Sequence, residues 1–150
     1  MNMDRKLSSH IENITAFETL PDGEVLVIGE ELDKSDLNVF FEKRGKTLIT
    51  RSHVDVVDGR DTGKFAVVIV TSDVSCQSEE ELLKLLREMH GFLVDEGILV
   101  AFFNSEKAAE GQECPFYSNR SISQMVSHVF PDEQIATLMS GERRVIAKKR

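Results

Sequence analysis

Three short segments are apolar along almost their whole length, and they constrain the fold more than any other feature. They read EVLVIG at Glu24–Gly29, FAVVIV at Phe65–Val70 and ILVAFF at Ile98–Phe103. A strand of this kind needs cover on both faces, which helices provide when they pack on the two sides of a parallel sheet. The sequence therefore predicts an α/β fold with a mostly parallel sheet.

Length and charge limit the class of protein. The chain has 150 residues, which predicts a single domain over residues 1–150. Its net charge of −8 makes nucleic acid an unlikely partner, since a phosphate backbone requires clustered Lys and Arg. No apolar run approaches the roughly 20 residues that span a bilayer, and the amino terminus has no signal-peptide core. These features predict a cytoplasmic protein without membrane contact.

Apolar residues three or four positions apart predict helices, namely Asp4–Leu20, Glu31–Arg44, Ser78–Val94 and Ser121–Phe130. The third has the clearest start, because Ser78 and Glu81 form a capping box and three carboxylates meet the positive end of the helix dipole. The second is predicted to end at Gly45, in a position that favours a left-handed residue.

Further strands are predicted at Lys46–Arg51 and His53–Val57, and an antiparallel hairpin at Gln134–Met139 and Arg143–Ala147. The last strand carries the only basic cluster, formed by Arg143, Arg144, Lys148, Lys149 and Arg150. We interpret it as a solvated edge strand guarded by lysine. Cys76, Cys114 and the histidines show no metal-ligand spacing, so no metal site is expected.

The order of these elements resembles class I S-adenosylmethionine-dependent methyltransferases. The segment from Phe65–Val70 through the capped helix to Ile98–Ala101 is similar to that family's fourth and fifth strands with the helix between them. The resemblance implies a Rossmann-like three-layer αβα sandwich that closes with an antiparallel hairpin. It divides the domain into an amino-terminal helix (4–20), a core (24–103), a loop (104–118) and a carboxyl-terminal helix and hairpin (119–150).

The places that hold the cofactor in that family differ in this chain. The glycine-rich turn after the first strand retains Gly29 alone, followed by Glu30, Glu31 and Asp33. Three acids in five positions would repel the carboxylate of the cofactor's methionine part. The acidic residue that takes the ribose hydroxyls would fall near Arg51, where the sequence has no acid.

Two functions follow from this comparison. The first is a non-catalytic methyltransferase-like domain, a pseudoenzyme without cofactor, that acts through contacts with an unidentified protein or with itself. Its expected contact residues are the aromatic pair Phe116 and Tyr117, exposed on the polar loop. The alternative is a divergent small methyltransferase that binds S-adenosylmethionine and modifies a small molecule or a protein.

Under the enzyme alternative, Gly29, Glu30, Asp58 and Asp73 line the cofactor site, and Asp73 is the candidate catalytic base. Three of these residues also have a structural interpretation. Asp58 beside Gly59 suits a turn, Asp73 can cap a strand end, and Glu30 can stabilise the start of the following helix through its dipole.

Overall fold

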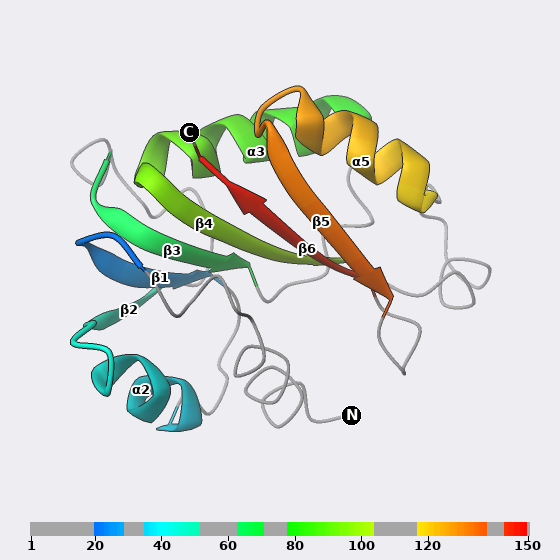
Figure 1. The fold of residues 1–150 in the computed structure, drawn as a ribbon. Coiled ribbons are helices and arrows are strands. Elements are labelled where there is room, and N and C mark those ends of the chain that lie inside the picture. Colours follow the sequence, from blue (N-terminus) through cyan, green and yellow to red (C-terminus); the bar gives the residue numbers. More distant parts are fainter. Residues whose placement is uncertain are drawn as a thin grey trace.

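The computed structural model describes residues 20–28, 35–51, 63–70, 78–103, 117–137 and 143–149 (Figure 1). Six strands form one sheet in the order β2-β1-β3-β4-β6-β5. Their bounds are β1 Glu24–Ile28, β2 Leu48–Arg51, β3 Phe65–Val70, β4 Leu93–Phe103, β5 Asp132–Thr137 and β6 Arg143–Lys148. The first four are parallel to one another, and β6 runs antiparallel to both β4 and β5. The predicted mostly parallel sheet with a closing antiparallel pair is confirmed.

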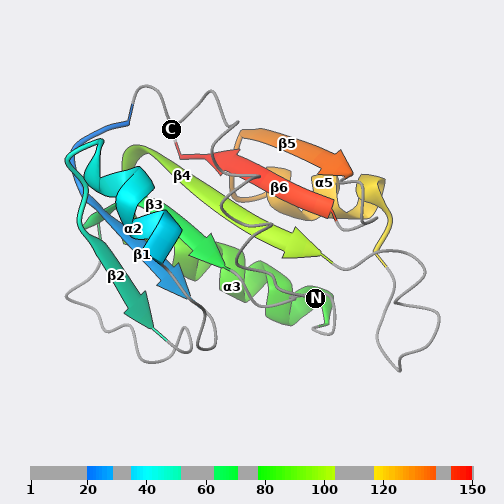
Figure 2. The same ribbon diagram turned by 90° about the horizontal axis from the view of Figure 1, so that it is seen from below.

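Helices cover both faces of this sheet, which gives three layers (Figure 1). Helices α3 (Glu79–Phe92) and α5 (Asn119–Ser127) pack on one face, and α2 (Ser35–Glu42) lies on the other, over β1 and β2 (Figure 2). Every residue of β3 is buried, as is β1 apart from its first residue. The continuous apolarity of these strands therefore reports a sheet buried on both faces, as expected for a Rossmann-like fold.

The capped helix begins where the sequence predicts. The Oγ of Ser78 accepts a hydrogen bond from the backbone amide of Glu81, and its hydroxyl donates to the Glu81 carboxylate at 3.0 Å. The helix ends at Phe92, two residues before the predicted Val94. Leu93 is extended and fully buried because it already pairs with Phe65 as the first residue of β4.

Three described glycines, Gly23, Gly45 and Gly63, have positive φ angles that other residues rarely adopt. Gly45 follows α2 with a φ of +70°, which confirms the predicted left-handed position. Gly23 has a φ of +141°, and a Cβ there would lie 2.8 Å from the backbone nitrogen of Ala66. The turn before β1 can therefore approach β3 closely because it carries no side chain at this point.

Helix α5 begins two residues earlier than predicted and ends at Ser127. Ser118 is its N-cap, because its Oγ accepts from the backbone amide of Ser121 at 3.1 Å. Phe130, which the sequence analysis placed in the helix, follows it and is fully buried. The chain then turns directly into β5.

The basic strand is not an edge strand, which corrects the sequence interpretation. β6 lies between β4 and β5, and its charges are used within the molecule. Lys148 forms a 2.9 Å ion pair with Glu96, and the Nζ of Lys149 donates to the carbonyls of His90 and Leu93 at 3.0 and 2.9 Å. The basic residues suggested edge protection because β6 is the last strand in the sequence. The sequence does not reveal that β6 pairs with β4 and that the preceding strand, β5, takes the edge position.

The predicted helix at Asp4–Leu20 lies almost wholly outside the described residues, and the predicted strand at His53–Val57 lies outside them entirely. Across the described ranges, no helix is long and apolar enough to cross a membrane.

Candidate functional site

The carboxyl ends of the four parallel strands meet at one edge of the sheet, where ligands of open α/β folds bind (Figure 2). The strands end at Ile28, Arg51, Val70 and Phe103. The segments that follow them, residues 29–34, 52–62, 71–77 and 104–116, lie outside the described residues. The sequence-predicted residues Gly29, Glu30, Asp58, Asp73 and Phe116 belong to these segments, so their roles stay predictions.

The described floor of this edge is apolar. Ile28, Val70 and Phe103 are buried, and all three belong to the cluster that packs beneath α3 and α5. These side chains offer no hydrogen-bonding groups, so polar recognition at this edge has to come from the surrounding backbone or from residues on its rim.

Tyr117 does not have the exposure expected of an interface aromatic. Only 9% of the residue is exposed, and its ring lies edge-on to Phe103 with 6.4 Å between the centroids. Burial raises the pKa of the Tyr117 phenol, and the nearby carboxylates of Glu79 and Glu81 raise it further. The residue packs inward because it immediately precedes the N-cap of α5, which lies on the core. Tyr117 thus packs against the end of β4 and is not the exposed anchor that the sequence analysis expected.

The sequence analysis placed Arg143 in the basic cluster of a solvated edge strand, but the structure buries it beside this edge of the sheet. It begins β6 opposite Phe103, is 5% exposed, and donates from Nη1 to the backbone carbonyl of Tyr117. The same nitrogen lies 3.5 Å from the Oδ1 of Asn119. Arg143 thereby ties the start of α5 to the sheet. The available signal was its position: Arg143, Val145 and Ala147 alternate on the inward face of the strand.

Helices α3 and α5 both begin at this edge, and the residue before each helix caps its start. Ser78 caps α3, whose first turn carries Glu79, Glu80 and Glu81, and Ser118 caps α5. Carboxylates at a helix start complement its partial positive charge. An anionic group of a ligand would meet this acidic turn at the α3 end of the site.

The register of β2 places Arg51 at the strand end where the resemblance in sequence led us to look for an acidic residue. Arg51 is the last residue of β2 and is the partner of Ile28, the last residue of β1. An arginine carries five donors and no acceptor, so it cannot accept a hydrogen bond from a ribose hydroxyl as a carboxylate does. The second strand thus ends at the predicted residue, and that residue is an arginine.

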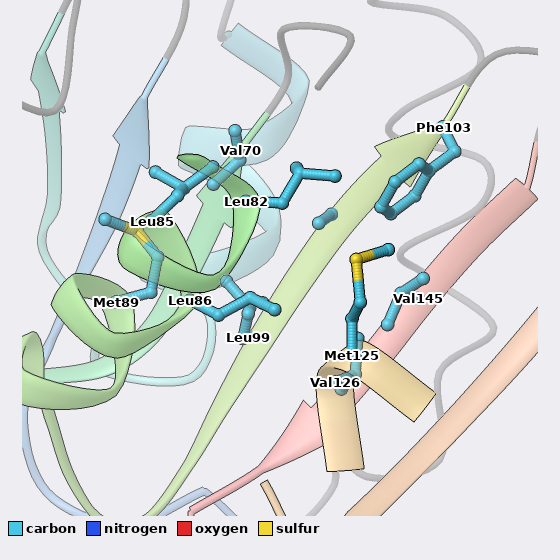
Figure 3. Close-up of a pocket in the computed structure, with 11 residues that line it drawn as sticks. Val70, Leu82, Leu85, Leu86, Met89, Leu99, Phe103, Met125, Val126 and Val145 are labelled. Atoms are coloured by element: carbon cyan, nitrogen blue, oxygen red, sulfur yellow. The ribbon is translucent and has the colours of Figure 1, made fainter. Parts of the chain in front are cut away.

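A small cavity of about 20 Å³ lies inside the core, between the sheet, α3 and α5 (Figure 3). Its lining is wholly apolar and includes Leu86, Leu99, Met125 and Val145. A space of this size holds at most about one water, and a water needs polar partners that are absent here. It is a packing defect rather than a ligand site. Among the described residues, no group of three His, Cys, Asp or Glu could hold a metal ion.

Several solved structures of S-adenosylmethionine-dependent methyltransferases have a fold similar to that of this chain. The S-adenosylmethionine-dependent methyltransferase from Archaeoglobus fulgidus has a TM-score of 0.66 at 12% identity, covering 97% of this chain and 94% of that one. Magnesium protoporphyrin IX methyltransferase from Synechocystis, solved with bound S-adenosylhomocysteine, has a TM-score of 0.64 at 13% identity, covering 99% and 84%. The methyltransferase SibL, solved in its apo form, has a TM-score of 0.67 at 12% identity, covering 97% and 55%, so this chain spans little more than half of its length.

No family model matches the sequence, and no curated protein matches it. The likeness at these identities is one of fold. The chain has a class I methyltransferase-like, Rossmann-like α/β fold.

Proposed function

We propose that this chain is a methyltransferase-like domain that has lost catalysis and acts through protein contacts. The observation that carries the proposal is Arg51 at the end of β2, paired with Ile28 at the end of β1. Arg51 has no acceptor atom in its side chain, so it cannot accept the hydrogen bonds that ribose hydroxyls would donate to a carboxylate at this position. The proposal gives the retained sheet a role as a scaffold, since a fold does not by itself imply its common activity.

The sequence of the first turn supports the same conclusion. Glu30, Glu31 and Asp33 follow Gly29 where the related fold has a glycine-rich turn. Side chains there hinder a close approach of the backbone to a ligand, and their charges repel a carboxylate. The acidic turn thus disfavours the methionine carboxylate of the cofactor, and Arg51 at the end of β2 disfavours its ribose.

The direct test is cofactor binding by the full chain. We expect no change in melting temperature with S-adenosylmethionine or S-adenosylhomocysteine at millimolar concentration. A ligand at 100 times its dissociation constant would stabilise the fold by roughly 2.7 kcal/mol, which a thermal melt detects readily. Isothermal titration calorimetry at the same concentrations checks the result without heating. A clear upward shift in melting temperature would overturn the proposal.

The second candidate is a divergent methyltransferase for a small molecule or a protein. It is favoured by the shared fold with the Synechocystis enzyme, whose structure contains S-adenosylhomocysteine. Under this function Gly29, Glu30, Asp58 and Asp73 line the cofactor site, with Asp73 as base. Binding in the micromolar range would have to be lost in Gly29→Trp and retained in the control Val39→Trp, whose residue is half exposed on α2.

A further inference from the structure

The edge strand β5 contains no lysine, proline or bulge along its six residues. Edges are commonly blunted by lysine, proline or a bulge. β5 reads DEQIAT, and its register with β6 is regular over all six residues. Lys148 lies at the end of the inner strand β6, which separates β5 from β4 (Figure 1). Its charged residues, Asp132 and Glu133, are confined to its first two positions. The remaining four positions are uncharged and suited to pairing with another strand.

Backbone geometry indicates which groups of β5 face outward. Lys149 exchanges backbone hydrogen bonds with Glu96 and Gly97, so its peptide groups point toward β4. Peptide groups alternate in direction along a strand, so those of Lys148, Ile146 and Arg144 point toward β5. Their register partners in β5 are Asp132, Gln134 and Ala136.

The peptide groups of the intervening residues, Glu133, Ile135 and Thr137, consequently point away from β6. In the described part of the chain no strand pairs with this outer side of β5. The three residues also share one face of the sheet, the face of α5, where Ile135 packs against the core and Glu133 accepts a hydrogen bond from Ser123 at 2.6 Å.

We propose that β5 pairs with β5 of a second copy of this chain, antiparallel about a two-fold axis at Ile135. In this register Ile135 faces Ile135 of the copy, and Glu133 faces Thr137 at both ends. Each facing pair is built from outward peptide groups and can exchange two backbone hydrogen bonds. A register shifted by two residues along β5 would lose one of these three pairs.

Charge complementarity favours a second copy as the occupant. β5 is acidic where it begins, at Asp132 and Glu133, while its other end lies beside basic residues of β6. Thr137 is the partner of Arg143, and Ala136 is the partner of Arg144. An antiparallel arrangement brings the acidic end of each copy to the basic end of the other, with no like charges directly opposite within β5. The two sheets then continue as one.

This inference deepens the proposed function by naming a partner and a surface for its protein contacts. The two remain separable, because a monomer would overturn the dimer without changing the cofactor result. Conversely, cofactor binding would overturn the loss of catalysis and leave the dimer intact.

The first measurement is the mass of the full chain in solution, by light scattering coupled to size exclusion and by sedimentation velocity. We expect twice the chain mass of 16.9 kDa at high micromolar concentration, with dissociation on dilution. A mass of one chain throughout would overturn the proposal.

The second measurement uses substitutions at Thr137, an exposed residue whose peptide nitrogen points outward. Thr137→Pro removes the donor and should raise the dimer dissociation constant about tenfold or more, because the bond is lost at both ends of the interface. Thr137→Ala is the matched control, since it removes the hydroxyl and keeps the donor, and it should leave the constant nearly unchanged.

A charge pair tests the register. Thr137→Glu places a carboxylate opposite Glu133 of the other copy and should weaken the dimer between about twofold and thirtyfold. Thr137→Lys places an opposite charge there and should not weaken it. Circular dichroism verifies that each variant is folded. A dimer that responds equally to the glutamate and the lysine, or to neither the glutamate nor the proline, would place its interface elsewhere and overturn the inference.

Discussion

At the scale of single residues, Leu86 and Ser78 separate the two contributions that hold α3 in place. Leu86 lies in the core and lines the small cavity, whereas Ser78 caps the helix at an exposed position. Leu86→Ala should lower the free energy of unfolding by about 2–5 kcal/mol, and Ser78→Ala by about 1 kcal/mol. Urea unfolding measures both. The reverse ranking would contradict the assigned helix face.

His90 gives the molecule a pH-dependent element near the carboxyl end of α3. Burial lowers the pKa of its imidazole, Lys149 lowers it further, and Asp95 opposes the shift. Its ring also lies 5.2 Å from that of Phe130. The unfolded chain therefore binds a proton at a higher pH than the folded one, near the ordinary value of about 6.5.

The sign of the effect follows from this difference. The contribution of neutral His90 is fully present above about pH 6.5 and is lost as the pH falls toward the lower folded pKa. Urea unfolding at pH 7.5 and 5.5 should show a smaller loss of stability for His90→Gln than for the wild type. If both proteins lost the same free energy of unfolding between pH 7.5 and 5.5, His90 would not be the group responsible for the pH dependence.

At the scale of elements, the residue that follows β6, Lys149, caps the carboxyl end of α3. The Lys149 ammonium donates to two carbonyls at the end of α3, where a positive charge also complements the helix dipole. Lys149→Met should therefore lower the free energy of unfolding by about 1–2 kcal/mol. The matched control is Lys148→Met at the neighbouring residue, the last of β6, which removes an exposed ion pair with Glu96 and should cost less than about 1 kcal/mol. Chemical denaturation of both variants tests the difference, and equal losses would refute the capping role.

Arg143 has a comparable role at the opposite end of β6. Through the carbonyl of Tyr117 it fixes the chain just before α5 begins. The two ends of one strand thus hold the two helices of the same layer. Arg143 at the start of β6 and Lys149 just beyond its end thus have hydrogen-bond partners next to α5 and α3.

At the scale of the whole molecule, the proposed function implies that cofactor binding was lost at two separate places, the turn after β1 and the end of β2. The triple variant Glu30→Gly, Glu31→Gly, Asp33→Gly removes the acidic turn and leaves Arg51 at the end of β2. We expect at most a feeble thermal shift with S-adenosylmethionine, because the ribose contact is still missing. Adding Arg51→Asp should increase the shift, if the two changes act on separate parts of the cofactor. A strong shift in the triple variant alone would show that the turn was the sole obstacle.

The sequence by itself determined the parallel core. Continuous apolar runs specify strands that are buried on both faces, and the serine cap with three following glutamates specifies the start of α3, because both signals are local. The resemblance supported by these segments also led to the correct fold. The site roles predicted for Gly29 and Glu30 stay predictions, whereas the register of β2 with β1 confirmed the predicted end of the second strand at Arg51.

Tertiary structure decided the features that depend on long-range pairing. Burial of Tyr117 follows from its contact with Phe103, and burial of Arg143 from the pairing of β6 with β4. The early end of α3 has the same origin, since Leu93 leaves the helix to pair with Phe65. Strand order places lysine-bearing β6 inside and β5 at the edge. These outcomes are set by partners far away in the chain, whose positions no local pattern of residues encodes.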